Sequence, residues 1–294
     1  MRPSRGESGR SVGRSFGIDR KLSATSLAAP AAIAYLRSMT RITSLEGVHN
    51  FRHFHGYDGL DGARVKDGLY RSGHFSRASA PDWDHIGGLG IQVVADLRKP
   101  RERTNEPSNW PDPIAPRVLA SDKGDTGEPP HLRFLRTGVH TTEGVRDYML
   151  SAYRRIPMEA GNMDVYRDAY RALATGDAEA GFLVHCAAGK DRTGIFCAII
   201  LDELGVDADT VIADYEMTNQ AVDFDAIIPR IRERVLADYG QAMEPAMMRT
   251  FLGVDGDYLR QAFEVMGGVD HYVRDHLGID EHERDALRAR WLTG

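Results

Sequence analysis

The stretch that decides the fold is residues 181–204, which read GFLVHCAAGKDRTGIFCAIILDEL. Its first four residues are apolar, and they predict a short buried strand. The run from Gly194 to Leu204 is almost entirely apolar, which predicts a helix that is buried on nearly all sides. A glycine-containing loop joins the two. A strand, a tight loop and a helix in this order are the building unit of α/β domains, so the sequence predicts that class.

The loop itself has the form Cys, five residues, Arg, with Cys186 and Arg192 at its ends. A strand-to-helix loop turns successive backbone N–H groups inward and adds the positive end of the helix dipole, so it binds anions. Arg192 can add a bidentate fork onto two phosphate oxygens, and the same field stabilises a thiolate. The sequence therefore predicts a phosphate site around a nucleophilic cysteine. The residues predicted to contact the phosphate are Ala187, Ala188, Gly189, Lys190, Asp191 and Arg192.

Neighbouring residues have predicted supporting roles. Thr193 is placed to hydrogen-bond the cysteine sulfur and aid its departure, and His185 is expected to fix the loop. Lys190 would add a second cation beside the phosphate. The second cysteine, Cys197, is expected to pack in the protein core from the buried helix; a protective disulfide with Cys186 is the alternative. For the loop itself, the alternative is that Cys186 is only a buried cysteine at a strand end and that Arg192 makes an ordinary salt bridge. Gly189 and the strand–loop–helix setting favour the anion site.

Phosphoryl transfer also needs a general acid that protonates the leaving oxygen, and two residues are candidates for it. Asp191 lies inside the loop, where repulsion from a bound phosphate dianion favours the protonated form that a general acid requires. Asp96 follows a second predicted strand, Ile91 to Ala95, and the carboxyl ends of parallel strands share one edge of a sheet. Asp96 could equally be a structural partner of Arg98. We favour Asp191 and keep Asp96 as the rival.

The predicted strands, helices and turns in the rest of the chain fit the same α/β fold. Val65 to Arg71 is a predicted strand, and Ser79 is a candidate cap for a helix ending at Ile86. Residues 99–130 are dense in Pro, Gly, Asn and Asp, and we expect a long irregular segment there. The expected fold is a central, mostly parallel sheet flanked by helices, with a helical C-terminal half. Further helices are predicted at about 143–156, 163–175, 207–219, 224–238, 256–266, 268–276 and 281–291.

Composition narrows the class of protein. The 294 residues are 42% hydrophobic and carry a net charge of −6, which argues against wholesale electrostatic binding to nucleic acid. No window approaches the roughly 18 apolar residues of a membrane span. The two cysteines form no disulfide framework, and no Cys/His spacing of a zinc site is present. We expect a metal-independent protein without a cofactor, in the reducing cytoplasm.

The first 40 residues differ from the remainder. They hold seven Arg or Lys against two acidic residues, a charge of +5, so the overall −6 leaves −11 for the rest. They are rich in Ser, Gly and Ala, and we expect residues 1–42 to be a disordered basic extension and residues 43–294 a single domain. A signal peptide with an apolar stretch from Leu22 to Leu36 is the alternative, with export as its consequence. Translation from Met39 is another.

Several motifs together resemble one known family. The segment from His185 to Gly194 looks like the loop of the bacterial atypical tyrosine phosphatases, a group that includes a secreted mycobacterial enzyme active on phosphotyrosine, phosphoserine/threonine and phosphoinositides. The resemblance extends over about residues 44–292. It is carried also by Asn50-Phe51-Arg52 with Gly56-Tyr57, by Leu69-Tyr70-Arg71-Ser72-Gly73, by Asp96-Leu97-Arg98 with Glu102, and by Gly253 to Gly278.

The resemblance implies a tyrosine-phosphatase-like fold, with Cys186 as nucleophile, Arg192 as phosphate clamp and Asp191 as the acid of the loop. It also implies a helical lid, which we expect among the helices at 207–238. Lys190 makes the loop similar to those of phosphoinositide phosphatases. This chain departs from the family at His53-Phe54-His55, where the family usually has Asp-Leu-Gly. We expect these histidines to be packing or surface residues.

The expected activity is hydrolysis of phosphomonoesters on phosphorylated protein or phosphoinositide, through a phospho-cysteine intermediate. One alternative is a catalytically silent phosphate-binding module; such modules usually lack the cysteine, the arginine or the acid, and all three are present here. Another is a sulfur-transfer or arsenate-reducing enzyme, against which the Lys190-Asp191-Arg192-Thr193-Gly194 ending argues.

Overall fold

The computed structural model describes residues 41–124, 133–134, 136, 141–176, 181–240 and 244–293. They belong to one compact unit, Ser38–Gly294. The predicted basic extension, residues 1–42, lies outside the described residues except for its last two positions.

Five strands of the described residues form one sheet, in the order β1-β2-β5-β3-β4. Strand β1 is antiparallel to β2, and the other neighbours are parallel. In the register, both Ser72 and Asp96 lie opposite His185, so β2, β5 and β3 end at the same edge of the sheet. The strands are β1 Arg52–His53, β2 Leu69–Ser72, β3 Val93–Asp96, β4 Arg117–Leu119 and β5 Phe182–His185.

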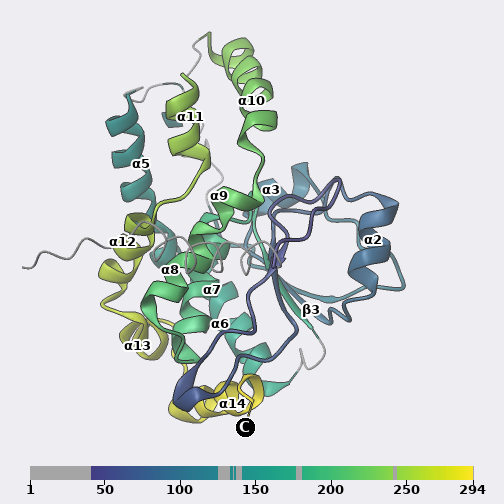
Figure 1. Ribbon diagram of the computed structural model, residues 1–294, viewed down its shortest axis with the longest axis vertical. Helices are drawn as coiled ribbons and strands as arrows, with labels where there is room; N and C mark the ends of the chain where they lie inside the picture. Colours follow the sequence, from purple (N-terminus) through teal and green to yellow (C-terminus); the bar gives the residue numbers. More distant parts are fainter. Residues whose placement is uncertain are drawn as a thin grey trace, which may run out of the picture. The chain divides into compact units, whose positions relative to one another are not determined.

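The central strands are buried on both faces, which explains their continuous apolar runs. Side chains alternate along each strand: Phe182 and Val184 of β5 join a large core, and Leu183 joins a smaller one. The small core is closed by α2 (Ala80–Gly87), whose first turn has the predicted Ser79 capping box with Asp82. Figure 1 shows α2 on the side of the strands away from α6 and α7.

The large core is built on α7 (Asp191–Glu203), which directly follows the loop after β5. In α7, Thr193 and every residue from Ile195 to Leu201 are 0–1% exposed, and Gly194 is buried, as the apolar sequence predicts. The helices that pack against α7 are α6 Ala160–Thr175, α8 Ala208–Glu216, α12 Gly256–Met266 and α13 Val269–His271. The other elements of this part of the chain are α3 Pro100–Asn105, α5 Thr142–Arg155, α9 Thr218–Ala221, a π-helical turn Tyr272–His276, and α14 Glu281–Trp291.

Two further helices, α10 (Phe224–Tyr239) and α11 (Pro245–Leu252), extend from this core. Helix α11 packs against both α10 and α5, and it lies between them (Figure 1). The Lys190 ammonium of the predicted phosphate loop contacts the carbonyl group of Phe251 in α11. The loop and this helical group are therefore directly connected.

The structure confirms the predicted fold class: a mostly parallel sheet, flanked by helices, with a helical C-terminal half. Three local predictions were wrong. The helix after the loop begins at Asp191 rather than Gly194, because the loop residues themselves make its first turn. The segment 99–130 is not irregular throughout: α3 starts at Pro100, and β4 pairs with β3. Val65 forms only an isolated bridge, to Leu292, ahead of β2.

Among the described helices, none combines the length and the apolar character that a membrane span requires.

Candidate active site

The predicted loop, residues 186–190, joins the end of β5 to the start of α7. Its tight path depends on Gly189, which has φ +67°, a left-handed conformation that favours glycine. A Cβ on Gly189 would lie 2.3 Å from the carbonyl group of Ser72, at the end of β2. The loop therefore lies directly against the neighbouring strand, and Cys186, only 2% exposed, is at its base.

The peptide groups of the loop are oriented with their oxygens outward. The oxygen of Ala187 accepts from the N–H group of His74 at 3.2 Å, and that of Gly189 accepts from Asn50 Nδ2 at 2.8 Å. Among the described residues, no oxygen accepts a hydrogen bond from the N–H groups of Ala187–Thr193. These N–H groups lie at the N-terminus of α7, which makes the loop an anion nest.

A buried ionic network supports this loop from behind. Asp214 accepts from Arg71 Nη1 at 2.9 Å and from the Tyr57 hydroxyl at 3.0 Å. Arg52 donates to the backbone oxygen of Asp214 at 3.1 Å and to the side chain of Asn50. Burial, together with repulsion from Arg71, lowers the pKa of Arg52 to about 10, which still leaves it charged at neutral pH. The network fixes Asn50 and, through it, the loop.

Arg192 is fixed by a carboxylate from the β3 side of the site. Its Nη1 and Nη2 donate to the two carboxylate oxygens of Glu102 at 2.6 and 2.8 Å, and Nη1 also donates to the oxygen of Leu97 at 2.8 Å. Burial alone would lower the pKa of Arg192, but Glu102 and the sulfur of Cys186 outweigh it and raise that pKa. Among the described residues, no group accepts from Nε. Arg192 is thus a permanent cation held in one orientation.

Asp191 is the partly exposed carboxylate of the loop. Its side chain is 25% exposed, and Oδ1 accepts from the Tyr153 hydroxyl at 2.6 Å. The Lys190 ammonium is 3.6 Å from the same oxygen. Asp191 therefore lies at the mouth of the loop with a neutral hydrogen-bond donor behind it.

Lys190 does not project over the nest. Its Nζ donates to the oxygens of Phe251 at 2.6 Å and Gly253 at 3.2 Å, and the residue is only 8% exposed. The structure places this ammonium in a carbonyl cage at the end of α11, whereas the sequence suggested a second cation on the phosphate.

Asp96 lies at the same sheet edge, but its oxygens are occupied. Arg98 donates to it from the backbone N–H and from Nε and Nη2, at 2.7–3.2 Å. Burial favours the neutral carboxyl, yet His185 and Arg98 outweigh it and lower the pKa of Asp96. His185, 3.7 Å away, is itself fully buried, and burial lowers its pKa. Asp96 is thus a buried carboxylate in an ion pair.

Thr193 is fully buried in the first turn of α7, and its hydroxyl has no partner among the described residues. At the positions that differ from the family pattern, the rings of His53 and His55 stack with centroids 4.0 Å apart, and His55 Nδ1 is 2.8 Å from Asp67. Within the described residues, no three His, Cys, Asp or Glu side chains gather as a metal site.

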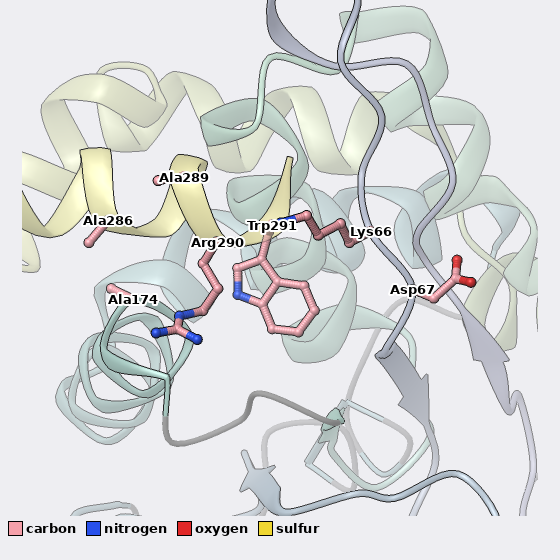
Figure 2. Close-up of a pocket in the computed structure, with 7 residues that line it drawn as sticks. All are labelled: Lys66, Asp67, Ala174, Ala286, Ala289, Arg290 and Trp291. Atoms are coloured by element: carbon pink, nitrogen blue, oxygen red, sulfur yellow. The ribbon is translucent and has the colours of Figure 1, made fainter. Parts of the chain in front are cut away.

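A cavity of about 600 Å³ lies elsewhere, between α14 and the residues that precede β2 (Figure 2). Figure 2 shows Arg290 and Trp291 of α14 at this cavity, with Lys66 beside Trp291 and Asp67 beyond it. No residue predicted for catalysis lines it. The candidate active site is therefore the loop, and the large cavity is separate from it.

Sequence reasoning found the loop and both aspartates but missed three contacts: Tyr153 on Asp191, Glu102 on Arg192, and Asp214 on Arg71. Glu102 and Arg71 belong to the quoted motifs, so a motif signal existed for them. Tyr153 belongs to none of the quoted motifs and lies within the helix predicted at about 143–156.

Comparisons with known proteins identify the family of this chain. A family model described as "Tyrosine phosphatase family" matches residues 43–293. The chain is 31% identical to a candidate tyrosine-protein phosphatase of Cupriavidus necator over 264 residues, which cover 85% of this chain and 88% of the relative. It is also 31% identical to the triple specificity protein phosphatase PtpB of Mycobacterium tuberculosis, over 84% of this chain and 98% of the relative. A tyrosine-protein phosphatase of Nostoc commune is 25% identical over 94% of each chain. The chain thus belongs to the tyrosine phosphatase family.

Proposed function

We propose that this phosphatase hydrolyses phosphomonoesters through a phospho-cysteine formed on Cys186. The observation that carries the proposal is the arrangement at the start of α7. There, the N–H groups of Ala187–Thr193 and the fixed cation of Arg192 surround a buried cysteine. An array of donors around a nucleophile stabilises both a phosphoryl dianion and the charge that develops during its transfer.

In the first step, the nest binds the three phosphoryl oxygens and the free Nε side of Arg192 adds to them. The Cys186 thiolate attacks phosphorus and an S–P bond forms as the P–O bond to the leaving group breaks. Asp191, in its protonated form, gives its proton to the leaving oxygen and becomes a carboxylate. Glu102 keeps Arg192 oriented throughout.

In the second step, water attacks the phosphoryl group and Asp191 takes its proton. The S–P bond breaks and the electron pair returns to sulfur. The Thr193 hydroxyl, which is buried and has no described partner, is placed to donate to that sulfur. Inorganic phosphate then leaves, and Asp191 is again protonated.

We assign the acid to Asp191 rather than Asp96. A general acid must carry a proton in the complex with substrate, and a buried ion pair opposes that state. Arg98 occupies both oxygens of Asp96 and lowers its pKa. Asp191 has a neutral donor, Tyr153, and 25% of its side chain is exposed at the loop. Asp96 is then a structural residue that positions the β3 edge.

The substrate class follows from the family. Phosphotyrosine is the primary expected substrate, and the triple specificity in the name of the mycobacterial relative motivates tests of phosphoserine/threonine and phosphoinositide. Lys190 gives no added support to inositol head groups, because its ammonium is bound at Phe251 and Gly253. We further propose that residues 43–294 form one catalytic domain, supported by the family match and the compact unit. A free thiol nucleophile favours a reducing, cytoplasmic location.

The test is hydrolysis of an aryl phosphate, with a metal chelator present, by wild type and by Cys186→Ser. Turnover should survive the chelator and fall by roughly 10⁴ or more in the variant. Cys197→Ala is the matched control, because Cys197 lies in the same helix and burial raises its pKa to about 12. Comparable losses in both variants would remove the nucleophile assignment. An inactive wild type with a reduced thiol would instead favour the silent phosphate-binding module.

A further inference from the structure

Two buried tyrosines from different helices meet behind the carboxylate of the loop. Tyr153 of α5 and Tyr215 of α8 are both 0% exposed. The Tyr153 hydroxyl is 2.6 Å from Asp191 Oδ1 and 2.5 Å from the Tyr215 hydroxyl. The three groups therefore form a chain that runs from the core to the mouth of the active site.

The number of hydroxyl protons decides which group donates in each of these two hydrogen bonds. An ionised Asp191 can only accept, so Tyr153 donates its single hydroxyl proton to Oδ1. The Tyr153 oxygen is then the acceptor for the proton of Tyr215. Each donation polarises the next, which strengthens the bond to the carboxylate.

We propose that Tyr153 and Tyr215 are positioning residues for the acid step, which hold Asp191 at the leaving group and stabilise the carboxylate that it becomes. This inference rests on the proposed function of Asp191. No proton leaves either tyrosine. The transferred proton is that of Asp191, and the hydrogen bonds from the tyrosines only stabilise the negative charge that remains on its carboxylate. The same bonds hold the carboxylate ready as a base for the second step.

Both tyrosines keep their protons over the whole working range. Burial, and then the negative charge of Asp191, hold the pKa of the Tyr153 and Tyr215 hydroxyls well above the ordinary value. A change of the pH profile in these variants is therefore a change at the acid and not the ionisation of a tyrosine. The charged and titratable groups that face Asp191 are Lys190 and Arg192 beside it, Tyr148 and Tyr153 of α5, Tyr215 of α8 and Tyr258 of α12.

The experiment compares Tyr153→Phe with wild type on two aryl phosphates, p-nitrophenyl phosphate and phenyl phosphate, across pH. Phenylalanine keeps the ring that packs on Tyr215 and Tyr258 and removes only the donor. We expect kcat/KM to fall about tenfold for phenyl phosphate, the poorer leaving group, and far less for the nitrophenyl ester. The basic limb of the profile should move to higher pH, because the charged form of the acid loses a hydrogen bond. Equal losses on both substrates, or an unmoved limb, would overturn the inference.

The matched control is Tyr170→Phe, which removes another buried tyrosine–carboxylate bond, 2.8 Å to Glu203. It should cost stability without moving the pH profile. Tyr215→Phe, which removes only the second donor, should give a smaller shift in the same direction, so the test survives if Tyr153→Phe does not fold.

A double variant separates this inference from the proposed function. In Asp191→Asn, adding Tyr153→Phe should cause no further leaving-group effect, since the two changes act on one step. If Asp191→Asn itself shows no dependence on the leaving group, the acid assignment fails and the inference falls with it. If Asp191→Asn shows that dependence and Tyr153→Phe does not, the inference alone is wrong.

Discussion

Asp96 is the last residue of β3, and Asp191 comes shortly after the neighbouring strand β5, which ends at the same edge of the sheet. The two carboxylates differ in the groups that donate to them. Asp96 is 3% exposed and accepts from a guanidinium that is always charged. Asp191 is 25% exposed and accepts from a neutral hydroxyl; the nearest cation, the Lys190 ammonium, is 3.6 Å away and donates to the oxygens of Phe251 and Gly253 instead. A cation within hydrogen-bond distance commits a carboxylate to its charged form, whereas a neutral donor leaves protonation possible. The partner, more than the position on the sheet, decides which carboxylate can carry a proton to substrate.

The largest effect that tests this comparison is expected in Asp191→Asn. The amide keeps the shape but has no acidic proton, so kcat/KM for phenyl phosphate should fall by about 10² to 10⁴. The loss should shrink as the leaving group becomes better, because a good leaving group departs without protonation. Asp96→Asn, assayed on the same series, should show no such trend; if it does and Asp191→Asn does not, the two roles are reversed.

The two arginines extend the comparison. Arg98 neutralises a structural carboxylate, whereas Arg192 is held by Glu102 and keeps its Nε side for phosphate. Arg192→Ala should lower kcat/KM by about 10² to 10³ and weaken competitive inhibition by inorganic phosphate. Glu102→Gln should give a smaller loss in the same direction, because the guanidinium stays but loses its ionic support. Near-normal phosphate inhibition in Arg192→Ala would exclude the clamp.

The sequence predicted the parts of this site that lie along one stretch of chain. A strand, a loop and a helix in succession fix where Cys186, Asp191 and Arg192 fall, because their spacing is set by the backbone. The sequence could not predict the bond between Tyr153 and Asp191, which are 38 positions apart, or between Lys190 and Phe251, which are 61 apart. Those contacts depend on how α5 and α11 pack, and the periodicity of apolar residues shows only which face of a helix is buried.

A third prediction concerns stability rather than catalysis. Asp96→Asn leaves Arg98 buried beside a neutral amide, so the free energy of unfolding should fall by about 3–5 kcal/mol. Urea unfolding followed by circular dichroism measures this directly. Asp122→Asn, which breaks an ion pair between Arg103 and a 99% exposed aspartate, is the control and should change stability by less than about 1 kcal/mol. An equally small change in Asp96→Asn would contradict the structural role.

The smallest effect is the pH dependence of that contribution. The folded structure lowers the pKa of Asp96 below its ordinary 3.8, so the stabilisation is fully present above about pH 4 and is lost as the pH falls through the lowered value. The difference in unfolding free energy between wild type and Asp96→Asn should therefore be constant near neutral pH and shrink as the pH falls below the ordinary pKa of an aspartate. A difference that grows on acidification would show that the ion pair does not hold Asp96 ionised.

The most direct test of the central claim is to trap the intermediate. Asp191→Asn lacks the base of the second step, so with p-nitrophenyl phosphate, whose departure needs little protonation, the phospho-enzyme should accumulate. Acid quenching followed by peptide mass spectrometry should find one added phosphoryl group on the peptide of Cys186, absent after Cys186→Ser. Phosphate release by wild type together with a phosphoryl group on another residue, or on none, would contradict the account.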